Sequence, residues 1–199
     1  MKMYNSIMEG LFIIGLSSLP GGGKDYVADI LVNRYHFHKI SPGDMIRRLL
    51  KKMNLPVTRE GEQRIQADYK KRYGKDFLMK RVYDEALRSR DSRIVIPGIR
   101  SPGDIKFFKK RLGNNFKNVF IICAAKTRYN RMKRRNRQDA PKSIADFIKQ
   151  DAAERRLFDL DETRRLSDFK LRNDIGSRKL EKDIKKILDR SGLHHLATR

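Results

Sequence analysis

The chain reads Ser17-Ser18-Leu19-Pro20-Gly21-Gly22-Gly23-Lys24-Asp25-Tyr26 where a short apolar run, residues 11–16, meets a helical pattern, residues 24–35. A strand, a glycine-rich turn and a helix in this order form a cradle for phosphate. The glycines let backbone N–H groups approach phosphate oxygens, and the helix N-terminus adds partial positive charge. Lys24 is placed to reach the terminal phosphates of a nucleoside triphosphate. The expected nucleotide contacts in this stretch are Pro20, Gly21, Gly22, Gly23, Lys24, Asp25 and Tyr26.

The stretch departs from the usual pattern G-x-x-x-x-G-K-[ST] at two positions. Ser18 occupies the place of the first glycine, and Asp25 occupies the place of the hydroxyl residue that binds Mg²⁺. A carboxylate oxygen is itself a good Mg²⁺ ligand, so we expect Asp25 to contribute to a metal site. The alternative interpretation is a glycine-rich connection that binds no ligand.

The composition indicates a globular chain with an unusually basic balance. The 199 residues are 39% hydrophobic and 36% charged, and 47 Lys and Arg residues face 24 Asp and Glu residues, for a formal charge of +23. This excess favours partners that carry phosphate, from small nucleotides to RNA or another polyanion. A basic, solvated surface on a small nucleotide enzyme explains the charge equally well.

Cysteine content and hydropathy exclude several classes of protein. Cys123 is the only cysteine and stands in an apolar run, which excludes a disulfide framework and a Cys/His metal cluster. The apolar run at residues 11–16 is too short to cross a membrane, and no small-residue cleavage site follows it. We therefore expect a cytoplasmic protein with no membrane partner.

Apolar segments and helical patterns alternate along the chain. Strands are predicted at residues 11–16, 37–40, 93–97, 119–124 and 169–172. Helices are predicted at residues 24–35, 43–54, 58–73, 75–90, 102–112, 126–138, 143–157 and 177–190. This alternation predicts the α/β class, with a parallel sheet covered on both faces. Ligands of such sheets bind beyond the carboxyl ends of the strands, where the motifs of this chain lie.

A second motif, Ile40-Ser41-Pro42-Gly43-Asp44-Met45-Ile46-Arg47-Arg48, follows the second predicted strand. It resembles the I-S-x-G-D-[ML]-[LI]-R run that opens the acceptor-binding helix of P-loop nucleoside monophosphate kinases. The resemblance implies that Arg47 holds the phosphate of the acceptor, and a planar guanidinium suits two phosphate oxygens at once. Asp44 is either an acceptor contact or the N-cap of the helix.

Two further stretches resemble acceptor-binding parts of the same kinases. The helical stretch that opens at Thr58 resembles the acceptor-binding insert of archaeal adenylate-kinase-related and dephospho-CoA-kinase-like proteins, which makes Arg59 an acceptor contact or a solvated surface residue. After the third strand, relatives carry D-G-x-R where this chain has Pro97-Gly98-Ile99-Arg100. Arg100 is therefore implied to bind the acceptor phosphate. Pro97 replaces the aspartate that orders the Mg²⁺ shell or the attacking oxygen in the family.

The most basic segment follows the fourth predicted strand. Seven of the twelve residues from 126 to 137 are Lys or Arg. The segment resembles the lid R-x-x-R-[LM]-x-x-R-x-R-x-D-x-P-K-S of the archaeal relatives. The resemblance implies that Arg131 contacts the adenine side of ATP and that Arg135 and Arg137 stabilise the transferring phosphoryl group. A basic solvated helix and an RNA-binding helix are the alternatives.

The resemblance extends over residues 11–190, since Ser167-Asp168-Phe169-Lys170-Leu171-Arg172-Asn173-Asp174-Ile175-Gly176 resembles the last strand and turn of these kinases. It implies a three-layer P-loop fold with a five-stranded parallel sheet of order 2-3-1-4-5 and an arginine-rich lid. The whole chain, residues 1–199, is expected to form one domain, with an acceptor-binding insert at about 43–90 and the lid at about 126–150.

The expected function is ATP-dependent phosphoryl transfer, with Mg²⁺, to a small molecule that bears a phosphate. A nucleoside or deoxynucleoside monophosphate is the leading acceptor, dephospho-CoA is the alternative acceptor, and GTP is the alternative donor. A nucleotide- or RNA-binding protein with little turnover is the alternative from another class. Ser18, Asp25 and Pro97 favour that alternative, whereas Arg47 and Arg100 together argue for an acceptor.

Overall fold

The computed structural model describes residues 10–135 and 140–193. Its strands are β1 (Phe12–Ser18), β2 (His38–Lys39), β3 (Arg93–Pro97), β4 (Phe116–Ile122) and β5 (Phe169–Arg172). Its α-helices are α2 (Lys24–Tyr35), α3 (Pro42–Lys52), α4 (Arg59–Tyr73), α5 (Phe77–Ser89), α6 (Pro102–Leu112), α7 (Ala125–Arg135), α8 (Ile144–Phe158), α9 (Leu160–Leu166) and α10 (Ser177–Arg190). A short 3₁₀ helix, η1 (Gly113–Asn115), precedes β4.

The strands form one parallel sheet in the order β2-β3-β1-β4-β5, as predicted. β1 is the central strand and pairs with β3 on one side and β4 on the other. Leu16 of β1 lies opposite Pro97 of β3, and Ser18 lies opposite Ile121 of β4. The turns after β1, β3 and β4 therefore leave the sheet at the same edge.

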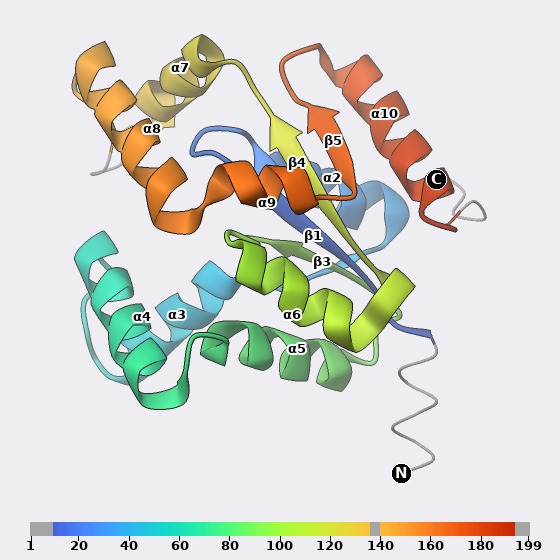
Figure 1. Cartoon of the computed structure of the whole chain (residues 1–199), viewed down its shortest axis with the longest axis horizontal. Coiled ribbons are helices and arrows are strands. Elements are labelled where there is room, and N and C mark those ends of the chain that lie inside the picture. The colour runs from blue at the N-terminus through green and yellow to red at the C-terminus, as the bar shows by residue number, and fades with distance from the viewer. Residues whose placement is uncertain (1–9, 136–139, 194–199) are drawn as a thin grey trace.

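Two hydrophobic cores cover the two faces of the sheet, which makes the fold three-layered. Ile14 and Leu16 of β1 pack with α2 and α10 on one face, while Ile13 packs with α5 and α6 on the other. Figure 1 shows the strands in the middle, with α6 in front of them and α2 behind. Burying one such side chain contributes about 1.5–3 kcal/mol, so both cores hold β1 in place.

A third, smaller core joins α3 to α4. Ile46 and Leu50 of α3 pack against Ile65 of α4. In Figure 1, α3 and α4 form a lower group of helices on the left, and α7 and α8 form an upper group on the same side. Within residues 10–135 and 140–193, no helix combines the length and apolar character that a membrane span requires.

The structure differs from the predicted elements chiefly at β4 and α9. β4 begins at Phe116 and ends at Ile122, three and two residues before the predicted limits, so Cys123 lies just after the strand. α9 was not predicted, because its seven residues carry mostly charged side chains and no apolar repeat. The predicted helix 126–138 is described only as far as Arg135, because residues 136–139 lie outside the described part.

Candidate active site

The glycine-rich turn, residues 18–24, has the backbone of a phosphate cradle. Gly21 and Gly23 have φ values of 78° and 88°, in the left-handed region that favours glycine. Gly23 is the N-cap of α2, and the helix begins at Lys24. The N–H groups of the first helical turn have no intrahelical partner, so they are available to an anion.

Ser18, which departs from the usual pattern, fits because Gly22 gives it room. A Cβ atom at Gly22 would lie 2.8 Å from the Cβ atom of Ser18 and 3.0 Å from the carbonyl oxygen of Leu19. The N–H of Gly22 also donates to that carbonyl at 3.0 Å, which closes the turn. A serine in place of the first glycine is therefore compatible with the cradle.

The two polar residues that open α2 form an ion pair. Nζ of Lys24 lies 3.0 Å from Oδ2 of Asp25, and the Asp25 side chain is about half exposed. Tyr26 is also about half exposed. A single exposed carboxylate beside a phosphate cradle suits Mg²⁺, which often binds one or two carboxylates together with substrate phosphates. Within the described residues, no cluster of three or more metal-binding side chains forms a separate metal site.

The turn after β5 contacts the glycine-rich turn through Asn173, to which the sequence assigned no role. The buried amide Nδ2 of Asn173 donates to the carbonyl of Gly22 at 2.9 Å. Arg131 donates to the carbonyl of Asn173 at 2.8 Å, and its guanidinium lies 3.4 Å from where a Cβ of Gly23 would be. Arg131 thus lies beside the glycine-rich turn, and its contact with the adenine side of ATP stays a prediction.

The predicted acceptor residues Asp44 and Arg47 form a network with a residue that the sequence did not single out. Ser41 is the N-cap of α3 and accepts a hydrogen bond from the N–H of Asp44, so Asp44 is not the cap. Asp44 instead accepts from Nη2 of Arg47 at 2.5 Å. Nη1 of Arg47 donates to Glu62 of α4 at 3.2 Å. No sequence pattern pointed to Glu62 as a partner of Arg47, because the two residues are 15 positions apart and lie on different helices.

These contacts shift the pKa values of both partners, each in the direction that favours its charged form. Burial raises the pKa of Asp44, but the hydrogen bonds from the side chains of Arg47 and Ser41 outweigh it and bring the pKa below the ordinary value. Burial likewise acts to lower the pKa of Arg47, and the hydrogen bonds to Asp44 and Glu62 reverse this effect. Both groups are therefore charged at neutral pH.

Arg100 lies after β3, on the turn that leads into α6. Its guanidinium carbon is 5.0 Å from the ring centre of Phe158, the last residue of α8. Its carbonyl accepts from Oγ1 of Thr163 in α9 at 3.1 Å. The structure therefore places Arg47 against α4 and Arg100 against α8, and it does not join the two guanidinium groups directly. The side chain of Arg59, the first residue of α4, lies outside the described part.

Pro97 ends β3 and is buried, and its side chain has no polar group to offer in place of the carboxylate of the family. The next residue, Gly98, donates its N–H to the carbonyl of Leu16 at 3.0 Å. A Cβ at Gly98 would lie 3.5 Å from the ring of Pro42, so the turn after β3 contacts the start of α3. The motif that begins at Ile40 and the motif that begins at Pro97 are thus neighbours in space.

The predicted catalytic arginines of the lid are only partly described. Arg135 ends α7 and is exposed, whereas Arg137 lies outside the described residues. Arg128, to which the sequence assigned no role, is 2% exposed and forms a bidentate pair with Asp151 of α8. Only its position in the arginine motif could have drawn attention to it.

The fold and the glycine-rich turn define a protein of the P-loop kinase-like class. A family model described as AAA domain matches residues 14–156. UPF0200 protein PH1008 of Pyrococcus horikoshii is 32% identical over 187 residues, which cover 88% of this chain and 97% of that protein. UPF0200 protein PYRAB09750 of Pyrococcus abyssi is 30% identical over 179 residues, which cover 88% and 95%. The chain belongs to the AAA domain family and to the UPF0200 proteins.

Solved structures support the fold alone. Shikimate kinase from Acinetobacter baumannii, in complex with shikimate, superposes with a TM-score of 0.58 at 17% identity, over 90% of this chain and 94% of that one. TT1252 from Thermus thermophilus gives a TM-score of 0.52 at 19% identity, over 90% and 97%. Folds of this kind generally bind ATP and Mg²⁺.

Proposed function

We propose that the protein transfers the γ-phosphoryl group of ATP to a small molecule that bears a phosphate, in the first place a nucleoside or deoxynucleoside monophosphate. One observation carries the proposal. β1, which leads into the glycine-rich turn, adjoins β3 in the sheet, and β3 adjoins β2. Arg47 follows β2 and Arg100 follows β3, so both arginines come after strands on the same side of β1. Arg47 and Arg100 are cations that a binder of nucleotide alone would not need there.

Each group has a distinct task in this reaction. The N–H groups of the glycine-rich turn and Lys24 bind the β- and γ-phosphates of ATP. Arg47 and Arg100 orient the acceptor phosphate, whose oxygen forms the new bond to the γ-phosphorus. The bond between that phosphorus and the β,γ-bridging oxygen breaks, and ADP leaves with the electron pair. Because phosphoryl transfer needs mainly positioning and cationic stabilisation, a site rich in lysine and arginine suits it.

Asp25 is the proposed protein ligand for Mg²⁺. The ion supplies neutralisation of the phosphate charge and alignment of the phosphates. Asp25 itself holds Lys24 at 3.0 Å, so the carboxylate also fixes where the ammonium group lies before ATP arrives. Arg135, together with Arg137, is proposed to stabilise the moving phosphoryl group.

The proposal includes the domain organisation of the chain and the source of its ATP. The chain acts as one domain, with residues 43–90 as the acceptor-binding insert and residues 126–150 as the lid. The separate core of α3 and α4 supports the assignment for these two helices, whereas α5 packs on the sheet. The proposed reaction uses cytoplasmic ATP.

A coupled assay tests the proposal. Purified protein is incubated with ATP and Mg²⁺ and with each ribo- and deoxyribonucleoside monophosphate in turn, and ADP release is measured. Dephospho-CoA is included, because turnover of that acceptor alone would replace the monophosphate proposal with the alternative kinase. ADP release that no acceptor accelerates would contradict phosphoryl transfer to a phosphate-bearing molecule.

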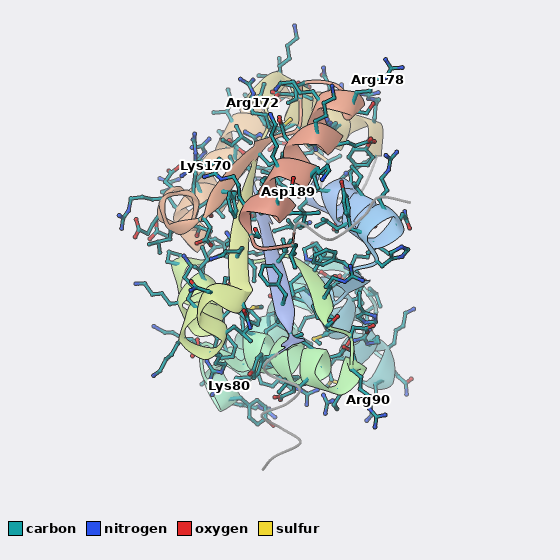
Figure 2. All side chains as sticks on the ribbon, turned by 90° about the vertical axis from the view of Figure 1, so that its right-hand side faces the viewer. Lys80, Arg90, Lys170, Arg172, Arg178 and Asp189 are labelled. Carbon is teal, nitrogen blue, oxygen red and sulfur yellow. The ribbon has the colours of Figure 1, made fainter. Side chains whose placement is uncertain are left out.

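A second candidate, RNA binding with little turnover, draws on the basic surface. Lys170 and Arg172 of β5 and Arg178 of α10 point outward on one face of the molecule (Figure 2). A steep fall of RNA affinity with salt concentration would favour this candidate, since each neutralised phosphate releases counterions. Replacing Lys170 and Arg178 with Gln should then lower the slope by about one unit for each phosphate that is no longer neutralised.

A further inference from the structure

Arg128 contacts three separate parts of the chain from a buried position. Nε donates to the carbonyl of Cys123, just after β4, at 3.2 Å. Nη1 donates to the carbonyl of Pro20 at 3.2 Å, in the glycine-rich turn. Nη1 and Nη2 also donate to the two carboxylate oxygens of Asp151 on α8. Among the residues whose side chains are described, Arg128 is the only charged residue that is buried.

The backbone of Arg128 contacts the same turn as its side chain. A Cβ atom at Gly21 would lie 2.7 Å from the carbonyl oxygen of Arg128 and 3.0 Å from its Cα. Gly21 therefore lies directly against the first turn of α7, and its φ of 78° suits glycine as well. A change in the backbone of the glycine-rich turn must be felt by Arg128, because no space separates them.

On the other side, α8 presents one face to Arg128. Asp151 binds the guanidinium, and Phe147, one helical turn earlier, has its ring centre 5.2 Å from the guanidinium carbon. Removing one partner of a buried pair leaves an uncompensated charge, so this contact strongly restricts where α8 can lie.

α8 also reaches the acceptor side of the site. Its last residue, Phe158, packs against the guanidinium of Arg100. Asp151 and Phe158 are seven residues apart, which is about 10 Å along a helix axis. One rigid element thus joins the nucleotide turn, through Arg128, to an arginine of the proposed acceptor site.

We propose that Arg128 is a positioning residue that couples the glycine-rich turn to α8, so that nucleotide bound at the turn fixes α8 and, through Phe158, the position of Arg100. The part of this inference that concerns nucleotide rests on the proposed function. The coupling between the turn and α8 is a property of the chain alone. Arg128 itself contacts neither nucleotide nor acceptor in this proposal.

Hydrogen exchange of backbone amides, followed by mass spectrometry on the full chain, tests the coupling. The variant is Asp151→Asn, which removes the carboxylate charge but retains the shape of the side chain. The matched control is Asp161→Asn. Asp161 is an exposed carboxylate that also pairs with Arg155, at 3.2 Å, and Arg155 lies 3.5 Å from Asp151 as well. The two variants therefore remove the same charge from the same neighbourhood, but only one of them disturbs Arg128.

In the absence of nucleotide, Asp151→Asn should speed exchange at least about threefold both in α8 and in the glycine-rich turn, whereas Asp161→Asn should leave the turn unchanged. A turn that exchanges at the wild-type rate in Asp151→Asn overturns the coupling. If Asp151→Asn does not fold, as judged by circular dichroism, Asp151→Glu replaces it. That variant keeps the charge but lengthens the side chain, and the same comparison applies.

With a non-hydrolysable ATP analogue and Mg²⁺, exchange should slow about tenfold in the turn and in α8 of the wild type and of Asp161→Asn. In Asp151→Asn it should slow in the turn but not in α8. Equal protection of α8 in all three proteins overturns the inference. If the pair of Arg128 and Asp151 only stabilised the fold, its loss would lower stability, but nucleotide would still slow exchange in α8. If the analogue protects neither segment of the wild type, the proposed function fails instead, and the comparison without nucleotide still decides the coupling.

Discussion

Glu62 of α4 accepts a hydrogen bond from Arg47 of α3 at 3.2 Å, so a carboxylate of α4 already binds one nitrogen of the arginine that is proposed to hold the acceptor phosphate. Asp44 occupies a second nitrogen of the same guanidinium. An incoming phosphate therefore meets a guanidinium that already has two N–H donors bound to carboxylates. The salt bridge between α3 and α4 is thus linked to acceptor binding, because the Glu62 carboxylate uses an N–H donor of Nη1 and its negative charge repels a phosphate at the same guanidinium.

Glu62→Gln should strengthen acceptor binding. The substitution removes the competing charge, and a half-exposed pair of this kind contributes up to about 1 kcal/mol, which is roughly fivefold in affinity. Isothermal titration with the acceptor that the coupled assay identifies measures the effect. Glu60→Gln is the control, since it removes the same charge from the same helix, two residues before Glu62. Equal effects of the two substitutions would show that only the overall charge matters.

Lys24→Ala should abolish turnover while the protein stays folded. Lys24 is the cation that the turn places at the β- and γ-phosphates, and its Nζ contacts only an exposed carboxylate in the described structure, so folding depends little on it. The measurement is kcat in the coupled assay, with the melting temperature as the control for folding. An unchanged kcat would remove the glycine-rich turn from the mechanism.

Arg47→Ala and Arg100→Ala should weaken acceptor binding and leave ATP affinity almost unchanged. Each substitution removes a charge-assisted contact of about 1.5–3 kcal/mol, or roughly ten- to a hundredfold in affinity. Titration of each variant with acceptor and with an ATP analogue separates the two effects. A parallel loss of both affinities would contradict the assignment of these arginines to the acceptor side.

The stability contribution of Asp174 should depend on pH in a defined direction. The N–H of Ala124 donates to its carboxylate at 2.9 Å, and this bond, followed by the one from Arg172, lowers the pKa of Asp174 below the ordinary 3.8. A lowered pKa means that the stabilisation is complete above 3.8 and is lost as the pH falls through the folded-state value. Asp174→Asn should cost about 1–2 kcal/mol at neutral pH.

Chemical denaturation of wild type and Asp174→Asn at pH 7, 5 and about 3.5 measures this difference. The difference in the free energy of unfolding should be equal at the two higher pH values and smaller at the lowest. Asp183→Asn, on α10, serves as the control because it removes a carboxylate that only lysines contact in the described structure. A constant difference across the range would show that the charge of Asp174 is not what stabilises the fold.

The sequence was sufficient for the elements whose residues interact locally. The apolar residues of β1, followed by glycines and Lys24, predicted the strand, the turn and the start of α2, because a phosphate cradle needs these residue types in immediate succession. The strand order came from the resemblance and is confirmed by the sheet. α9 escaped prediction because only Leu160 and Thr163 of its residues are buried, which leaves too few apolar positions for a period.

The residues that support the site could not be predicted, since their partners are remote in sequence. Arg128 and Asp151 are 23 residues apart, and Asn173 binds a carbonyl 151 residues away. No helical or strand spacing connects such pairs. The glycine-rich turn is therefore recognisable from its own residues, whereas the groups that hold it in place are visible only in the fold.

Asp25→Ser should change how ATP binding depends on Mg²⁺. Lys24 and Asp25 form an ion pair at 3.0 Å, so the carboxylate both occupies the lysine and places a negative charge beside the phosphates. Without a metal ion this charge repels the triphosphate, and with Mg²⁺ it becomes a ligand. Wild-type affinity for ATP should therefore rise steeply with Mg²⁺ concentration. In Asp25→Ser, ATP should bind more tightly than in the wild type when Mg²⁺ is chelated, and should gain less when Mg²⁺ is added.

Titration of ATP at several fixed Mg²⁺ concentrations, with EDTA at the lowest point, measures both curves. Asp29→Ser, one turn further along α2, is the matched control. Asp29 pairs with Lys39 of β2 at 2.6 Å rather than with Lys24, so it should follow the wild-type curve. The direction of the metal-free result separates the two roles of Asp25. A carboxylate that only positioned Lys24 would leave ATP binding weaker after its removal, whereas one that repels the phosphates leaves it stronger. Equal wild-type affinity with and without Mg²⁺ would exclude Asp25 as a metal ligand.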